Sequence, residues 1–270
     1  YMDGQPNPMP LQMELLAART LLLTWRHGIL DGVGINLLLE QLACGQIATA
    51  EPVPPPAEST PGQLYQQALP VINTLKDMTT LGSHSAWDRS RPLGGEPGFH
   101  LIELSSAQSD AVAETCRRTC GDFFQMPFFA AVAARALWRL HTLRGLALGG
   151  CHMEVPFQAR KRAPGAVFQN RMGMLLLPLL ESEMSTFSGA AAHVLAVYKD
   201  SVKRQLPKAS EALGALMMYL PSRALMPIIR FQNRGEICSL FHSHTGTFLR
   251  GVECFAGAEV ANVYTIPSVS

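Results

Sequence analysis

The stretch Arg26-His27-Gly28-Ile29-Leu30-Asp31-Gly32 follows the apolar run Leu21-Leu22-Leu23-Thr24-Trp25. The run predicts a strand, and the apolar spacing of residues 34–42 predicts a helix, so the stretch between them is expected to be a loop. A histidine at the end of such a strand faces whatever cleft lies there, and its imidazole can act as a fixed general base. We expect the Asp31 carboxylate to turn back and anchor the loop. Gly32 is expected to allow a sharp turn where a side chain would collide.

The same region has a second interpretation, as a nucleotide-binding loop. Gly32-Val33-Gly34-Ile35-Asn36-Leu37 lies between a predicted strand and a predicted helix, as a dinucleotide fingerprint does. However, Leu37 replaces the third glycine, and about twenty residues further on the chain is rich in proline rather than a strand that ends in an acid. The sequence therefore favours a loop that presents His27.

The composition is that of a globular chain with a large core. Of its 270 residues (29.4 kDa), 47% are hydrophobic and 16% are charged, which excludes a disordered protein. This length allows one large domain or two small ones. The formal net charge of +1 gives no electrostatic reason to expect nucleic acid or an anionic membrane as a partner. No apolar run reaches the roughly 18 residues of a membrane span.

Cysteine and histidine positions predict no metal site. The six cysteines form no CxxC pair and no signal peptide is visible, so we expect a reduced, cytoplasmic setting. Cys116 and Cys120 are one helical turn apart and are expected to pack in a core. His242 and His244 share one face of a predicted strand, but no third ligand stands at a recognisable spacing. GxSxG, Walker and HExxH motifs are also absent from the sequence.

Helices and strands are expected to alternate irregularly along the chain. The expected helices are residues 34–42, 63–81, 105–120, 126–143, 184–206 and 211–230. The expected strands are residues 15–26, 99–104, 146–155, 172–179, 237–242 and 259–264. Proline, glycine or basic residues predict a linker at residues 51–61 and loops at residues 92–98 and 160–165. Paired helices between strands predict an α/β protein of the α+β type with a mixed sheet, rather than a regular βαβ repeat.

Residues 26–32 resemble the HHxxxDG motif of the chloramphenicol-acetyltransferase-like superfamily of CoA-dependent acyltransferases. This superfamily includes peptide-synthetase condensation domains, plant alcohol acyltransferases and bacterial wax ester synthase/diacylglycerol acyltransferases. Later segments resemble its other motifs in the same order: residues 155–160 its "vPvdlR", residues 169–179 its "GNrfG…lPL", and residues 241–246 and 255–260 its "SNxxG" and "fxGaxv". Three positions depart from the pattern. Arg26 replaces the first histidine, Gln169 a glycine and His244 an asparagine.

The resemblance implies two similar α/β lobes that meet at a solvent tunnel, with His27 midway along it. Residues 1–50 would then be the end of an N-terminal lobe that carries the HxxxDG motif. Residues 51–98 would be a proline-rich linker and a crossover helix, and residues 99–270 the C-terminal lobe. Because Tyr1 is not an initiator methionine and residues 264–270 have the pattern of an unfinished strand, we expect the chain to be an incomplete part of this two-lobe fold.

The resemblance also implies direct transfer of an acyl group from a thioester to a hydroxyl or amine. His27 would be the general base, a role that typically accelerates a reaction about 10²–10⁴-fold. Asp31 would brace the loop by pairing with Arg160. The oxyanion would be stabilised by protonated His27 or by the region of Ser243. The other motif positions would have structural roles, at Gly32 and Asn170, or lie along the substrate tunnel, at Arg26, Ser243 and His244.

Donor and acceptor stay open at this stage. The thioester would be acyl-CoA or an acyl carrier protein, and no tightly bound cofactor is expected. The apolar composition and residues 170–179 favour long acyl-CoA, whereas residues 239–246 favour a condensation-like enzyme that forms amide bonds. The three departures from the motifs also suit an alternative, a catalytically inactive binding or scaffold protein. Peripheral contact with a membrane, without a transmembrane segment, is a further open alternative.

Overall fold

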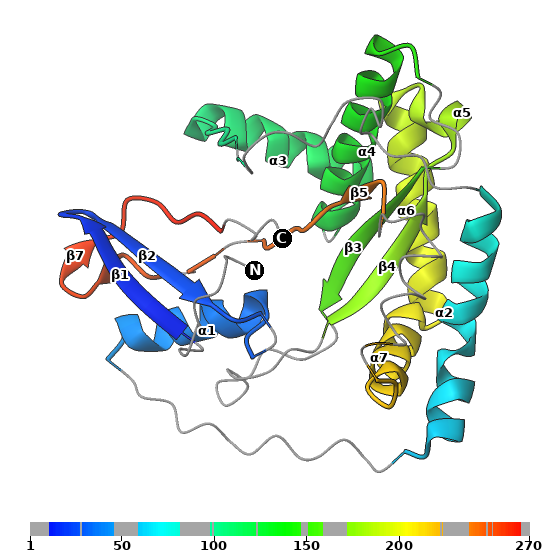
Figure 1. The fold of residues 1–270 in the computed structure, drawn as a ribbon. Coiled ribbons are helices and arrows are strands. Elements are labelled where there is room, and N and C mark those ends of the chain that lie inside the picture. Colours follow the sequence, from blue (N-terminus) through cyan, green and yellow to red (C-terminus); the bar gives the residue numbers. More distant parts are fainter. Residues whose placement is uncertain are drawn as a thin grey trace.

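The computed structural model describes residues 11–27, 29–45, 59–81, 98, 100–122, 124–146, 151–158, 172–221, 223, 238–246, 248–249 and 251–265. In chain order, the elements are β1 (Leu11–Ala17), β2 (Thr20–Trp25), α1 (Gly32–Ala43), α2 (Pro61–Leu81), α3 (Ser106–Cys120), α4 (Gln125–Leu143), β3 (His152–Gln158), β4 (Met172–Pro178), α5 (Glu181–Met184), α6 (Phe187–Lys203), α7 (Leu206–Met217), β5 (Leu240–Phe241), β6 (Cys254–Phe255) and β7 (Ala258–Glu259). Helices and small sheets are mixed along the chain (Figure 1). This confirms the expectation of mixed α and β structure at the level of fold class.

A three-stranded sheet in the order β4–β3–β5 supports the largest hydrophobic core. β3 and β4 are antiparallel, with Met153 opposite Leu177 and Val155 opposite Leu175, and all four side chains are fully buried. They share one face of the sheet because side chains alternate along a strand. Helices α4 and α6 cover this face and pack against each other.

Helices α2 and α7 pack on the other face of the sheet. Leu176 of β4 joins a buried cluster with residues of both helices, including Val71 and Ala209. α7 lies close to β4, because a Cβ built on Gly173 would come within 2.7 Å of the carbonyl oxygen of Pro207. Figure 1 shows α2 running beside α7 at the edge of the molecule.

A second, smaller core lies at the N-terminal part of the chain. The β1–β2 hairpin packs through Leu23 and Trp25 against α1, whose Ile35 is fully buried. A segment more than 200 residues further on completes this core, because Leu249 is buried in it and donates its backbone N–H to Oδ1 of Asn36 at 2.6 Å. In Figure 1 the orange segment after β5 crosses from the three-stranded sheet to the side of α1.

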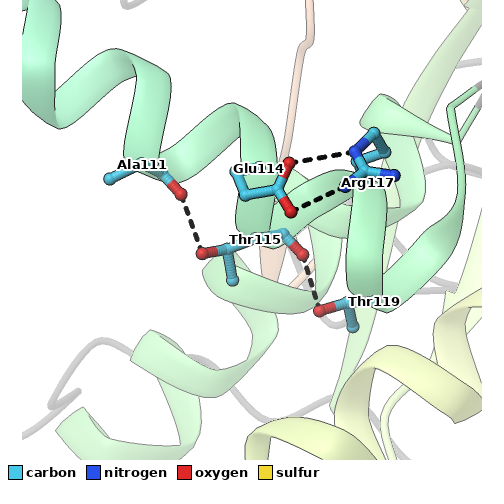
Figure 2. Close-up of polar contacts among 5 residues, drawn as sticks. All are labelled: Ala111, Glu114, Thr115, Arg117 and Thr119. Atoms are coloured by element: carbon cyan, nitrogen blue, oxygen red, sulfur yellow. Dashed lines mark hydrogen bonds and ion pairs between the residues drawn. The ribbon is translucent and has the colours of Figure 1, made fainter.

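Helix α3 shows how strongly local sequence defines the helices. Ser105 caps it in a capping box, in which the Ser105 and Gln108 side chains each accept from the other residue's backbone N–H. Glu114 pairs with Arg117 one turn later at 2.7 and 2.9 Å, and this pairing lowers the pKa of the Glu114 carboxyl (Figure 2). The capping box fixes the start of the helix expected at residues 105–120.

Most expected helices are confirmed in place, as is the strand at residues 172–179. The helices expected at residues 34–42, 63–81, 105–120 and 126–143 correspond to α1, α2, α3 and α4 within two residues at each end. Cys116 and Cys120 are buried in the large core, as expected for packing residues. Residues 51–58, 92–97 and 160–165, where the linker and loops were predicted, lie outside the described residues.

The prediction of a single buried strand at residues 15–26 is wrong. The chain instead forms a hairpin in which Ala17 pairs with Thr20 across a two-residue turn, and most of its side chains are exposed. A nearly continuous apolar run hides such a turn, because Ala18 and Arg19 carry no strong turn signal.

Other boundaries differ from expectation. The strand expected at residues 146–155 begins only at His152 and continues to Gln158, and the helix expected at residues 184–206 is α6, which begins at Phe187. The helix expected at residues 211–230 overlaps α7, which begins at Leu206, because Pro207 fits the first turn of a helix, and ends at Met217; residues 222 and 224–230 lie outside the described residues.

Three expected strands are absent or much shorter. Residues 100–104 form no strand, and the strands expected at residues 237–242 and 259–264 are reduced to the two-residue strands β5 and β7 among the described positions. Strands this short depend on their partners rather than on their own sequence pattern.

Candidate active site

The loop between β2 and α1 is held by hydrogen bonds within itself. The indole N–H of Trp25, at the end of β2, donates to the carbonyl oxygen of Leu30 at 3.1 Å. The backbone N–H of Ile29 donates to the carbonyl oxygen of Arg26 at 3.0 Å. Leu30 is buried in the small core, so one end of the loop is anchored by packing as well. The described residues on both sides of residue 28 are therefore hydrogen-bonded to each other.

Asp31 is the N-cap of α1. Its side chain is fully buried, and its Oδ1 accepts a hydrogen bond from the backbone N–H of Gly34 at 2.8 Å. A carboxylate at this position also interacts favourably with the positive end of the helix dipole. This contact fixes the point at which the loop ends and the helix begins.

Gly32 has a different environment from the one expected. A Cβ built on it would meet no atom within 4 Å, and its φ is not in the left-handed region. The expectation that a side chain would collide here is therefore wrong. The space beside the first residue of α1 is open.

Arg26 and His27 are exposed at the end of β2, on the part of the loop that faces solvent. His27 thus combines an accessible side chain with a loop whose two flanks, Trp25 and Asp31, are tied to the small core. An exposed imidazole can exchange a proton with a bound molecule.

Ser243 and His244 follow β5; Ser243 is exposed, and His244 contacts α4. The backbone N–H of His242 donates to the carbonyl oxygen of Glu154 at 2.9 Å, which extends the β3–β5 pairing. The His244 ring stacks on Phe129 of α4, with centroids 5.0 Å apart. Burial lowers the pKa of both histidines, and His244 lowers that of His242 further.

Asn36 links this segment to the helix that Asp31 begins. Five residues after His244, the N–H of Leu249 is bonded to Oδ1 of Asn36, whose Nδ2 donates to Glu40 on the same helix at 3.1 Å. Leu249, further along the chain than Ser243 and His244, is therefore bonded to the helix that Asp31 caps. Sequence reasoning gave Asn36 no role, because its partner is 213 positions away.

Arg160, Asn170 and Gln169 lie outside the described residues. The pairing of Asp31 with Arg160 therefore stays a prediction.

Glu154 is a titratable group that sequence reasoning missed. It lies on β3, between Leu176 of β4 and Phe241 of β5 in the strand registers. Burial raises the pKa of its carboxyl from the usual 4.5 to about 7. The sequence feature that could have indicated a buried acid is the position of Glu154 within the mostly apolar residues 151–157.

The described part of the chain holds neither a metal-binding cluster nor a membrane-spanning helix. There, no group of three His, Cys, Asp or Glu side chains is arranged to hold a metal ion. No disulfide joins the six cysteines, all of which are described. Among the described helices, none has both the length and the hydropathy needed to cross a membrane.

A scan against protein-family models finds no family that matches the chain, and a search of curated proteins finds no match.

Proposed function

We propose that this chain is part of an acyltransferase that moves an acyl group from a thioester to a hydroxyl or amine, with His27 as the general base. The observation that carries the proposal is the His27 loop. An exposed histidine lies between an indole hydrogen bond from Trp25 and a buried helix cap at Asp31. This arrangement supports the assignment of His27 as the base that the HxxxDG motif predicts.

In the proposed reaction, the acceptor oxygen or nitrogen attacks the carbonyl carbon of the thioester. An unprotonated ring nitrogen of His27 takes the proton that the acceptor loses. When the tetrahedral intermediate collapses, the carbon–sulfur bond breaks and the imidazolium returns the proton to the leaving thiolate. The acyl group passes directly between substrates, so no covalent intermediate on the protein is required.

Asp31 acts as a positioning residue in this proposal. Its buried carboxylate sets the start of α1, and α1 carries the Asn36 contact to the segment after His244. The open space beside Gly32 leaves room for a substrate next to the loop. Acyl-CoA or an acyl-carrier thioester is the proposed donor.

The test is thiol release from short and long acyl donors by the full-length protein, with hydroxyl and amine acceptors. His27→Ala should lower turnover by about 10²–10⁴-fold. Circular dichroism should stay unchanged, because an exposed side chain contributes little packing. His100→Ala, which removes another exposed histidine, is the matched control and should retain turnover. Unchanged turnover in His27→Ala would remove His27 from the mechanism.

A non-catalytic binding lobe is the second candidate. The observation in its favour is that Asp31 caps α1, because a helix cap stabilises a protein whether or not the protein is catalytically active. Binding of thioesters without turnover by the wild-type protein would support this candidate. Product masses would separate ester from amide formation and so identify a condensation-type enzyme.

A further inference from the structure

A row of three side chains crosses the three-stranded sheet at Glu154. In the strand registers, Glu154 of β3 is paired with Leu176 of β4 on one side and with Phe241 of β5 on the other. Paired residues on adjacent strands point to the same face of a sheet, about 5 Å apart. Met153, the residue before Glu154, is fully buried in the large core, so the row lies on the opposite face of the sheet.

The two ends of this row differ in their exposure to solvent. Leu176 is 5% exposed, because it belongs to the cluster that α2 and α7 form on β4 (Figure 1). Phe241 is 54% exposed, which is unusual for so large an apolar side chain within a strand. Glu154 is partly buried between the two. The acid therefore lies where the cover from the helices ends, beside an aromatic ring that is open to solvent.

The Glu154 carboxyl has no hydrogen-bond or ion-pair partner among the described residues. Its backbone carbonyl oxygen accepts from the N–H of His242, and burial is the one cause that raises the pKa of its side chain to about 7. A donor or a cation beside the carboxyl would lower that pKa instead. A partly buried carboxylate without a partner has a free-energy cost near neutral pH, and groups of this kind are concentrated at functional sites.

The neighbours of Glu154 indicate which kind of ligand would meet this carboxylate. Ca²⁺ and Mg²⁺ need several oxygen ligands, whereas Leu176 and Phe241 supply no side-chain oxygen. An organic ammonium ion fits this surroundings better. Its charge pairs with the carboxylate through charge-assisted hydrogen bonds. An aromatic ring such as that of Phe241 attracts both the cation and the alkyl groups attached to it.

We propose that Glu154 and Phe241 form a binding site for a small organic ammonium ion. The carboxylate accepts hydrogen bonds from the ammonium group, and the Phe241 ring lies beside the charged nitrogen and its alkyl groups. An ammonium nitrogen has no lone pair, so the group bound here is not one that attacks a thioester. The site therefore does not depend on the proposed acyl transfer.

The experiment is a ligand-observed NMR titration of the full-length protein with n-butylammonium chloride at pH 8, where the Glu154 carboxyl is mostly ionised. The wild type should bind n-butylammonium, and it should bind the neutral analogue n-butanol about tenfold more weakly, because n-butanol carries no charge. At pH 5 the binding of n-butylammonium should weaken about a hundredfold, because a carboxyl with a pKa of about 7 is then almost entirely protonated.

Two substitutions test the two sides of the site. Glu154→Gln should weaken the binding of n-butylammonium about tenfold or more and remove its dependence on pH. Phe241→Leu should weaken it about threefold, because leucine keeps apolar contact but has no aromatic face. Glu14→Gln is the matched control, since it removes the same charge from an exposed strand, and it should bind like the wild type. Circular dichroism verifies the fold of each variant.

Three outcomes would overturn the proposal. They are absence of n-butylammonium binding by the wild type at pH 8, equal binding by Glu154→Gln, and equal binding of n-butanol and n-butylammonium. Unchanged binding by Phe241→Leu would overturn the role of the aromatic ring.

Discussion

Replacing Glu154 with glutamine should change how the stability of the protein depends on pH. Glutamine has nearly the shape of a protonated glutamate but cannot ionise. In the folded protein, burial raises the pKa of Glu154 to about 7, whereas an unfolded chain would titrate near 4.5. Below about pH 4.5 both states are protonated, so the folded wild type loses nothing to this group.

The sign and size of the effect follow from these two values. As pH rises from about 4.5 to about 7, the unfolded chain releases its proton first, so the wild type loses stability throughout this window. Each pKa unit corresponds to about 1.4 kcal/mol, so the loss amounts to about 3 kcal/mol at and above neutral pH. Glu154→Gln cannot ionise and so avoids this loss. The difference in free energy of unfolding between Glu154→Gln and the wild type should therefore be about 3 kcal/mol larger at neutral pH than in acid.

Urea unfolding of both proteins between about pH 4 and pH 9 measures the difference directly. Glu14→Gln is the matched control, because Glu14 is on an exposed strand and the same charge is removed there. A difference between Glu154→Gln and the wild type that does not change with pH would refute the reasoning. It would mean that the Glu154 carboxyl has the same pKa in the folded protein as in the unfolded chain.

Three further substitutions test the contacts that hold the loop and the sheet. Asp31→Ala should lower the free energy of unfolding by about 1–2 kcal/mol in urea titrations, because α1 loses its N-cap. Asn36→Ala should accelerate hydrogen exchange at the amide of Leu249, which loses its buried acceptor; unchanged exchange would contradict the contact. Gly173→Ala should lower the thermal midpoint, with a cost of about 1–3 kcal/mol, because the new Cβ would meet the backbone of Pro207.

The sequence alone predicted most of the helices and the loop that carries the candidate base, His27. Helical hydrogen bonds join residues four positions apart, so apolar spacing and caps such as Ser105 lie within the same short window as the helix. The loop that presents His27 was visible for the same reason. Strand, loop and helix follow each other directly within residues 20–43, and Asp31 caps the helix that follows the loop.

Only the tertiary structure decided which strands formed and what surrounds the candidate site. β5 is two residues long and exists because β3 lies beside it, and the N-terminal core is closed by Leu249 from the far end of the chain. The raised pKa of Glu154 has the same origin, since an acid titrates according to its burial and not its sequence neighbours. Burial and strand pairing bring together residues that are distant along the chain, and a local sequence pattern does not identify those partners.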